Sequence, residues 1–374
     1  RRVHGESRLG DVYDCIDIQK QPALNHPLLS KITKSRLANQ PFHLYIIFNI
    51  ILNRKTRPSD ALRKTLRAAS SFSEERHNLV SAELDEECPT GTVPVRRYQN
   101  LNANAHKPII FSINATEYSL LATPKDYSFA GVGSTRTGFE KYQGVGGRAT
   151  VYNPKCDPHQ TSGVGVTILS TTNGHVGAIQ AGWMVNPDLY GDESTHFFVS
   201  WLQEKDGALN GCYNLACPGF VQVDRKNPVD GRLGHISTGG GVQFYADLRI
   251  TLDAATGDWW LTYLGDGKEI GYWPKTLFYG LTSGGDQVLW GGFVRSSLVY
   301  SPAMGSGVYD PSDRTKTSNI VFATIDKRAV FMPPDNTENV AVMNSRCYHA
   351  GGNMLTKDKL IGYQLLFGGP MCHY

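Results

Sequence analysis

Residues 195–202 have the sequence THFFVSWL, which is dense in β-branched and aromatic side chains. Three further segments have the same character: 242–250 (VQFYADLRI), 258–264 (DWWLTYL) and 287–290 (QVLW). This composition favours strands, and turn residues such as 255–258 (ATGD) and 283–286 (SGGD) separate the segments. Repeated short strands joined by glycine turns predict an all-β fold, with an antiparallel β-sandwich or barrel as its architecture.

The composition changes near residue 120. Of the 39 glycines only Gly5, Gly10 and Gly91 precede Gly131, and all six tryptophans lie within residues 183–290. The front of the chain instead carries helix formers at 57–69 and 73–84. The sequence therefore predicts a smaller, mixed N-terminal region followed by a larger all-β domain.

The predicted boundaries follow from this change. The N-terminal region spans residues 1–107, a linker spans 108–125 and the all-β domain spans 126–374. The polar, turn-rich residues 100–108 (NLNANAHKP) mark the junction as a place exposed to proteolysis. Residues 30–64 are basic and locally hydrophobic, unlike their surroundings, and stand out as an atypical insertion or as sequence translated in error.

Charge and hydropathy exclude two classes of partner. The net charge of +3 comes without clustered Lys and Arg, so no nucleic acid is expected. The longest apolar run, 42–52 (FHLYIIFNIIL), is shorter than the roughly 20 residues of a spanning helix. It is interpreted as a buried strand or helix, and no membrane is expected. Glycine-rich stretches 131–133 and 144–147 lack the Lys-Ser/Thr of a phosphate loop, so no nucleotide cofactor is predicted.

The seven cysteines are most simply interpreted as three pairs and one free thiol, Cys156. The pairs expected from placement are Cys15 with Cys88, Cys212 with Cys217 and Cys347 with Cys372, although sequence alone leaves the connectivity open. Disulfides favour an oxidising compartment. A zinc site is disfavoured because no second ligand pair and no HExxH is present, and no metal is predicted. Asn114 begins the single glycosylation sequon, Asn-Ala-Thr.

Short motifs in a fixed order carry a resemblance to a known family. In the front region they are 14–18 (DCIDI), 21–23 (QPA), 26–29 (HPLL) and 88–97 (CPTGTVPVRR). In the back region they are 181–183 (AGW), 211–222 (GCYNLACPGFVQ), 256–260 (TGDWW), 271–274 (GYWP), 290–292 (WGG) and 367–370 (FGGP). The first set resembles the activation-peptide region of the neprosin family, and the second is similar to the neprosin catalytic domain.

The resemblance implies a plant glutamic peptidase, secreted to the extracellular space, cell wall or vacuole. It implies a cleavable N-terminal segment and a β-sandwich that cleaves peptides next to proline in acidic surroundings. The two catalytic glutamates of the family stand in Glu-Ala-Gly-Trp and Trp-Gly-Gly-Glu. At those positions this chain has Gln180 and Phe293.

The two replacements remove the expected chemistry. A carboxyl pair needs one ionised acid to take a proton from water and one protonated acid to assist the leaving group. Gln180 can still donate a hydrogen bond to an oxyanion, whereas Phe293 offers neither a proton nor a lone pair. The chain is therefore predicted to be inactive or impaired. The alternative is an active acid prolyl endopeptidase that uses a displaced carboxylate, for which the candidates are Asp286, Asp192, Glu193, Glu204 and Asp206.

The resemblance also implies a substrate cleft around these positions, lined by Gly182, Trp183, Trp290, Gly291 and Gly292. Tryptophan is equally common in sandwich cores, so core and cleft both stay open for Trp183 and Trp290. Gln180 and Phe293 are expected to face each other across a sheet surface. The expected partners are proline-rich peptides or cell-wall polymers, without a cofactor. A purely structural role is the remaining alternative.

Overall fold

The computed structural model describes residues 3–6, 9–25, 57–70, 78–97, 108, 127–136, 140–171, 175–263, 267–325, 331–332, 340–343, 345–351 and 363–373. The apolar run 42–52, the sequon at Asn114 and most of the predicted linker lie outside these residues, so the predictions made for them stay predictions. Of the atypical segment 30–64, only residues 57–64 are described.

One large sheet has nine antiparallel strands among the described residues. Eight of them follow the order β10 (Val221–Gln222), β13 (Lys268–Trp273), β12 (Trp259–Tyr263), β11 (Tyr245–Leu252), β5 (Gly144–Thr150), β16 (Ser318–Ile325), β20 (Tyr363–Gly368) and β19 (His349–Gly351). The ninth, β17 (Phe331–Met332), pairs with β16.

A second antiparallel sheet has seven strands within the described part of the chain. Their order is β18 (Val340–Met343), β4 (Tyr127–Thr135), β14 (Gln287–Ser296), β6 (Gln160–Ser170), β7 (Gly177–Val185), β8 (His196–Lys205) and β9 (Ala208–Tyr213). The strands predicted at 195–202 and 287–290 are β8 and β14, and those predicted at 242–250 and 258–264 are β11 and β12.

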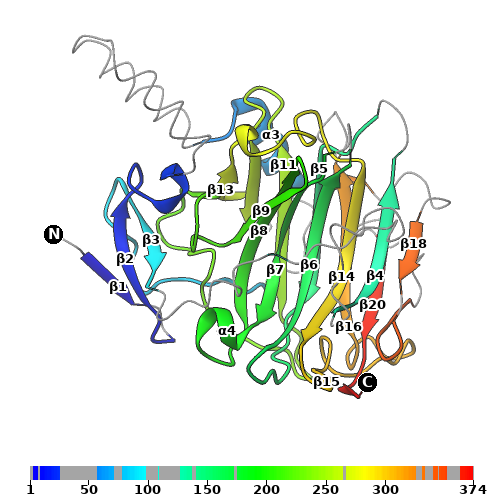
Figure 1. The fold of residues 1–374 in the computed structure, drawn as a ribbon. Coiled ribbons are helices and arrows are strands. Elements are labelled where there is room, and N and C mark those ends of the chain that lie inside the picture. Colours follow the sequence, from blue (N-terminus) through cyan, green and yellow to red (C-terminus); the bar gives the residue numbers. More distant parts are fainter. Residues whose placement is uncertain are drawn as a thin grey trace, which may run out of the picture.

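The two sheets stack as a β-sandwich, which confirms the predicted fold class (Figure 1). Apolar side chains of both sheets form one continuous core, as with Val166 and Trp183 of the seven-stranded sheet and Val145 and Ile320 of the nine-stranded sheet. Alternation of side chains along each strand leaves every second residue of β6, β7 and β14 on the opposite, outer face. The candidate site lies on this outer face.

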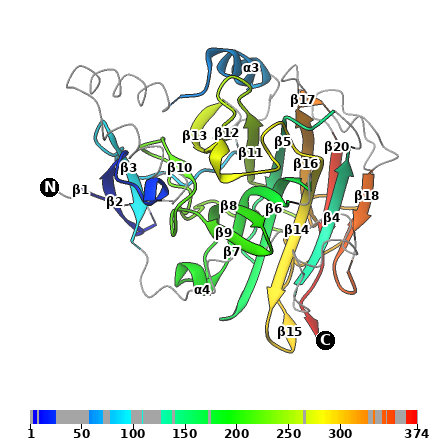
Figure 2. The ribbon, with the colours of Figure 1, turned by 45° about the horizontal axis from the view of Figure 1, so that its top comes forward.

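The N-terminal region adds a three-stranded antiparallel sheet of β1 (Val3–Glu6), β2 (Val12–Asp17) and β3 (Thr92–Arg96) beside the sandwich (Figures 1 and 2). It also contains the 3-10 helix η1 (Pro22–Asn25) and helix α3 (Asp60–Ser70). Helix α3 matches the helix formers at 57–69. The described part of 73–84 is not helical, because residues 79 and 84 form β-bridges instead.

Short elements complete the described fold. They are α4 (Pro187–Tyr190), the 3-10 helix η4 (Lys275–Leu277), and the pair β15 (Tyr300–Ser301) and β21 (Cys372–His373). Helix α4 begins at Asn186, whose side chain accepts from Leu189 N, and ends at Gly191 with φ 77°. None of the described helices has the length and hydropathy needed to span a membrane.

The three predicted disulfides are confirmed: Cys15–Cys88, Cys212–Cys217 and Cys347–Cys372. Cys156 is the free cysteine and is buried. Burial raises the pKa of its thiol to about 12, so the reactive thiolate is suppressed at neutral pH.

Candidate functional site

Gln180 and Phe293 lie on the same outer face of the seven-stranded sheet, on β7 and β14. Strand β6 runs between them: Thr167 pairs with Gln180 and Gly163 with Phe293. Directly opposed residues of neighbouring strands lie on the same face of a sheet. Residues 163 and 167 are an even number of positions apart along β6, so they and their partners all lie on one face. The two Cα positions are therefore offset by about 14 Å along the strands and about 10 Å across them. They share a face, but β6 and four residues of strand separate them.

Phe293 is fully buried, with 0% of its surface exposed. Its ring meets the ring of Phe198 edge to face, with 5.8 Å between centroids. Its Cζ atom lies over Gly163, only 2.6 Å from where a Cβ atom on that glycine would be. Phe293 therefore belongs to an apolar cluster on the outer face, which also contains Met184 and Leu289.

Gln180 is buried at 2% exposure and leaves a polar group unsatisfied. Its Oε1 atom has no hydrogen-bond partner among the described residues. The directly opposed residue on β8 is Ser200, whose buried Oγ is also without a partner there. Buried polar atoms of this kind are uncommon, because each costs about 1–3 kcal/mol when its hydrogen bond is missing. Two of them side by side indicate a place where a ligand atom would be stabilised.

A row of glycines separates Gln180 from Phe293 on this face. Gly291 pairs with Gly131 on β4 and with Gly165 on β6, and Gly165 pairs with Gly182 on β7. A Cβ atom on Gly182 would lie 1.9 Å from the carbonyl oxygen of Val164, so no side chain fits there. The Gln180 side chain lies over Gly165, with its Nε2 atom 3.1 Å from where a Cβ atom on that glycine would be. Gly182 and Gly291 thus lie in the row between the two candidate positions.

The expectation that Trp183 and Trp290 line the cleft is corrected by the structure, which places both in the core between the sheets. Each is 0% exposed and belongs to the main apolar cluster. Trp183 Nε1 donates to Thr150 O and Trp290 Nε1 donates to Gly146 O, both at 3.0 Å and both on β5 of the other sheet. Trp183 is three positions from Gln180 along β7, and Trp290 is three positions from Phe293 along β14. Because side chains alternate along a strand, both tryptophans lie on the face opposite to the candidate positions.

Gly292 faces the same core and not the outer face. A Cβ atom there would lie 2.6 Å from Met304 Sδ and 2.8 Å from Phe367, two members of the main core. Its role is to admit these side chains between the sheets.

Asp192 and Asp286 both form ion pairs with basic residues and make no described contact with Gln180. Burial raises the pKa of Asp192, but its hydrogen bond with His196 and the charges of His196 and Arg232 outweigh this and hold the pKa well below its usual range. Asp192 therefore stays ionised and cannot act as the general acid. Asp286 forms an ion pair with Lys141 at 3.5 Å and accepts from Thr171 N at 3.0 Å.

The other candidate acids also have structural or solvent-exposed settings. Glu204 lies on the outer face, but four residues along β8 from Ser200, and it accepts from Gly207 N at 2.7 Å in the turn to β9. Glu193 and Asp206 are exposed, and Asp206 has the positive φ of 53° typical of a turn. No group of three or more His, Cys, Asp or Glu suited to a metal occurs within the described residues.

Ser200 is the site residue that the sequence analysis missed. A signal was present, since Ser200 is the one polar residue in the run FFVSWL at 197–202. Alternation along this strand places it on the face of Phe198 and Leu202. Its proximity to Gln180 depends on the pairing of β7 with β8, which the sequence alone does not specify.

Comparison with known proteins gives two family matches. The family described as Neprosin matches residues 158–370, and the family described as Neprosin activation peptide matches residues 5–105. Gln180, Ser200 and Phe293 all fall inside the first match.

Among solved structures, scytalido-glutamic peptidase with a peptide-based transition-state analog is similar at 8% identity and a TM-score of 0.32, covering 66% of this chain and 98% of that one. SCP-B, a member of the Eqolisin family of peptidases in complex with the tripeptide Ala-Ile-His, has 8% identity, the same coverages and a TM-score of 0.31. Sheep galectin-11 in complex with glycerol has 10% identity and a TM-score of 0.21, covering 47% of this chain and 97% of that one.

Proposed function

The chain belongs to the neprosin family, and we propose that it is a secreted plant member that binds proline-containing peptides without cleaving them. The observation that carries this proposal is the pair Gln180 and Phe293 at the two glutamate positions of the family. Neither side chain ionises, and Phe293 is packed into an apolar cluster. Losing both members of a cooperative pair removes nearly all catalysis.

The buried pair Gln180 and Ser200 supports peptide binding. An amide and a hydroxyl can together donate to a backbone carbonyl and accept from a backbone N–H of a ligand. The neighbouring Gly165 and Gly182 carry no side chain that would keep a ligand backbone away. Atoms that lack a partner in the protein therefore gain one from an extended peptide.

The proline preference is supported by a residue of the chain itself. Pro108 lies over Gly211 of β9, with its Cδ atom 3.1 Å from where a Cβ atom on that glycine would be. Gly211 pairs with Leu202 and shares the outer face with Ser200. A segment of the chain itself therefore places a proline ring on this face.

The alternative of an active endopeptidase with a displaced carboxylate is weaker, because Asp192, Asp286 and Glu204 are held by ion pairs or backbone N–H groups. Cell-wall polymers stay a second class of ligand. Secretion is supported by the disulfides and the family, and glycosylation at Asn114 is part of the same proposal.

Titration calorimetry with a proline-rich peptide tests the binding, after the linker has been cut so that Pro108 can leave the face. We expect measurable affinity that falls roughly tenfold in Gln180→Met and in Ser200→Ala, because each removes one hydrogen bond to the ligand.

The matched control is Thr262→Val. Thr262 also has a buried hydroxyl without a described partner, but on β12 of the other sheet. Its replacement should leave affinity unchanged. If the folded wild-type protein binds no peptide at all, the purely structural role replaces peptide binding.

A further inference from the structure

We propose that the N-terminal region stays bound to the sandwich as a second chain after the linker is cut, so that the processed protein has two chains. The described part of this region ends at residue 97, and β4 of the sandwich begins at Tyr127. Cys15–Cys88 lies within the N-terminal region, and the other two disulfides lie within the sandwich. The association therefore rests on non-covalent contacts alone.

The N-terminal region supplies part of the hydrophobic core. Val80, Ala82, Val93 and Val95 are buried in the same cluster as Trp259 of the nine-stranded sheet. The contact is close, because a Cβ atom on Gly231 of the sandwich would lie 2.4 Å from Ala82 Cβ. Loss of the N-terminal region would expose this apolar surface to water, which disfavours separation.

A second apolar contact involves helix α3. Its Leu62 and Leu66 form a cluster with Trp260 and Tyr272 of strands β12 and β13, joined by Ala23 of η1. Trp260 is only 1% exposed with the helix in place. Release of α3 would leave this aromatic pair uncovered on the surface of the sheet.

Backbone groups of the sandwich are also satisfied by the N-terminal region. Gln222 on the edge strand β10 donates its N–H to Gln21 Oε1 at 2.8 Å, and Gln21 Nε2 donates to Gln222 O at 3.1 Å. The Gln21 side-chain amide thus makes the two hydrogen bonds that the backbone of a neighbouring strand would make. Tyr245 exchanges hydrogen bonds in the same way with Asn78 and Val80, both at 2.9 Å. Separation would exchange these hydrogen bonds for bonds to water and leave the edge strand β10 open.

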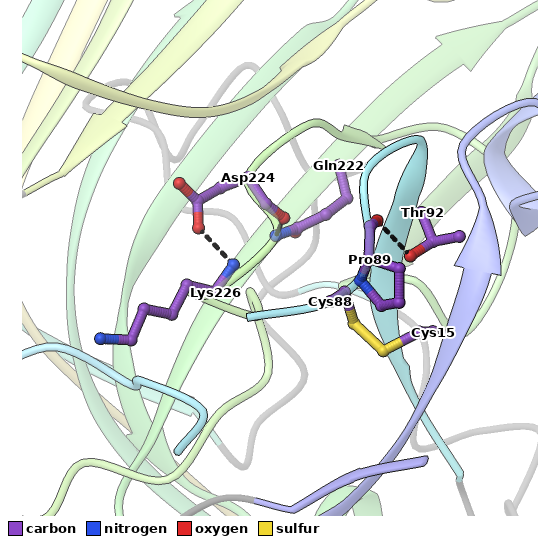
Figure 3. The surroundings of a disulfide bond; sticks show 7 residues. All are labelled: Cys15, Cys88, Pro89, Thr92, Gln222, Asp224 and Lys226. Atoms are coloured by element: carbon purple, nitrogen blue, oxygen red, sulfur yellow. Dashed lines mark hydrogen bonds between the residues drawn. A yellow bond between two sulfur atoms is a disulfide. The ribbon is translucent and has the colours of Figure 1, made fainter. Parts of the chain in front are cut away.

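The segment next to the disulfide extends this pairing. Figure 3 shows Cys15–Cys88 beside Gln222, Asp224 and Lys226 of the sandwich. Leu84 N donates to Lys226 O at 2.9 Å, and Cys88 N donates to Arg225 O at 3.0 Å. The disulfide keeps the residues that make these contacts in one unit.

A partly buried ionic cluster completes the interface, with the side chains of Arg232 and Asp192 27% and 23% exposed. Arg96 and Asp11 come from the N-terminal region, and Asp192 and Arg232 come from the sandwich. Each arginine contacts both carboxylates, at 3.2–3.3 Å for Asp11 and 3.0–3.4 Å for Asp192. The side chains of Arg96 and Asp11 are only 9% and 2% exposed. Deleting one member of the cluster would leave its partners incompletely neutralised in the docked state, so the cluster makes association sensitive to each of its charges.

His196 of β8 extends the cluster to the sheet. Arg96 Nη1 lies 2.9 Å from His196 Nδ1, and His196 Nε2 lies 2.9 Å from Asp192 Oδ1. A carboxylate only accepts, so Nε2–H donates to Asp192, while Nδ1 lies between the Arg96 guanidinium and the carbonyl oxygen of Asp230, which is also 2.9 Å away. His196 is 0% exposed and stacks on Tyr190 with 3.9 Å between ring centroids, so Arg96 contacts a fully buried side chain of the sheet.

The test places a site-specific protease sequence within residues 109–126 of the full chain. After cutting, we expect gel filtration at neutral pH to give one species that contains both fragments. A denaturing, non-reducing gel should then separate them, which shows that no covalent bond holds them. Elution of a folded sandwich fragment without the N-terminal fragment would overturn the proposal.

Two neighbouring arginines provide a matched pair of variants. Arg96→Ala should raise the dissociation constant of the cut protein roughly tenfold or more, because it leaves Asp11 and Asp192 less neutralised. Arg97 pairs instead with Asp14 of its own region at 2.6 Å, so Arg97→Ala should change the constant by less than about twofold. If Arg96→Ala does not fold, Gln21→Ala takes its place. Equal dissociation constants for the interface and control variants would overturn the proposed interface.

Discussion

Replacing Gln180 and Phe293 together by glutamate is expected to give the processed protein measurable cleavage of proline-containing peptides in acid. The two positions share the outer face across β6, with Gly165 and Gly182 between them. Either single replacement should give far less, because one carboxyl cannot serve as both base and acid. The assay compares turnover of the double and single variants at pH 2–6, the range in which a carboxyl pair titrates.

The matched control for this gain is Gln180→Glu with Phe293→Gln, which has nearly the same size but only one acid. Loss of the Phe293 ring should lower the free energy of unfolding by about 3–5 kcal/mol, and a buried carboxyl adds to this. Thermal unfolding must therefore confirm that each variant is folded. A folded double variant that cleaves no peptide would show that the substrate site has been lost as well as the acids.

Trp290→Ala is expected to lower the free energy of unfolding by about 3–5 kcal/mol, since it opens a cavity between the sheets and leaves Gly146 O without its donor. Denaturant unfolding measures this change. Tyr279→Ala is the control, because Tyr279 is an exposed aromatic residue and its loss should cost far less.

A milder variant at the same position distinguishes a core role from a cleft role for Trp290. Trp290→Phe should leave peptide affinity unchanged, because residue 290 points away from Gln180 and Ser200. A loss of affinity without a loss of stability would mean that Trp290 contacts the ligand after all.

Local composition was sufficient to predict an antiparallel all-β fold, and the family resemblance favoured the sandwich over the barrel. The strand at 287–290 was predicted too short, because Gly291 and Gly292 suggest a turn, whereas β14 continues through them to Ser296. Glycine is unfavourable in most strands, but here a Cβ atom would meet the backbone of a neighbouring strand at Gly291 and core side chains at Gly292. The same reason applies to Gly131 and Gly147, which lie inside β4 and β5.

The candidate site was predictable only where it depends on short motifs. Gln180 and Phe293 were identified from the three residues beside each of them. Ser200 was not, and neither was the contact of Arg96 with Asp192 and His196, because strand register and docking bring these residues together from distant parts of the chain. Likewise, motifs do not reveal on which face of a strand Trp183 and Trp290 lie until its pairing is known.

The measurement that tests the account most directly is peptide cleavage by the unmodified protein, with its linker cut, at pH 2–6. Without a carboxyl pair at residues 180 and 293, we expect turnover of proline-containing peptides no greater than that of the Gln180→Ala variant, which sets the background. Robust turnover that survives Gln180→Ala would contradict the account, because it would require a catalytic acid elsewhere in the chain.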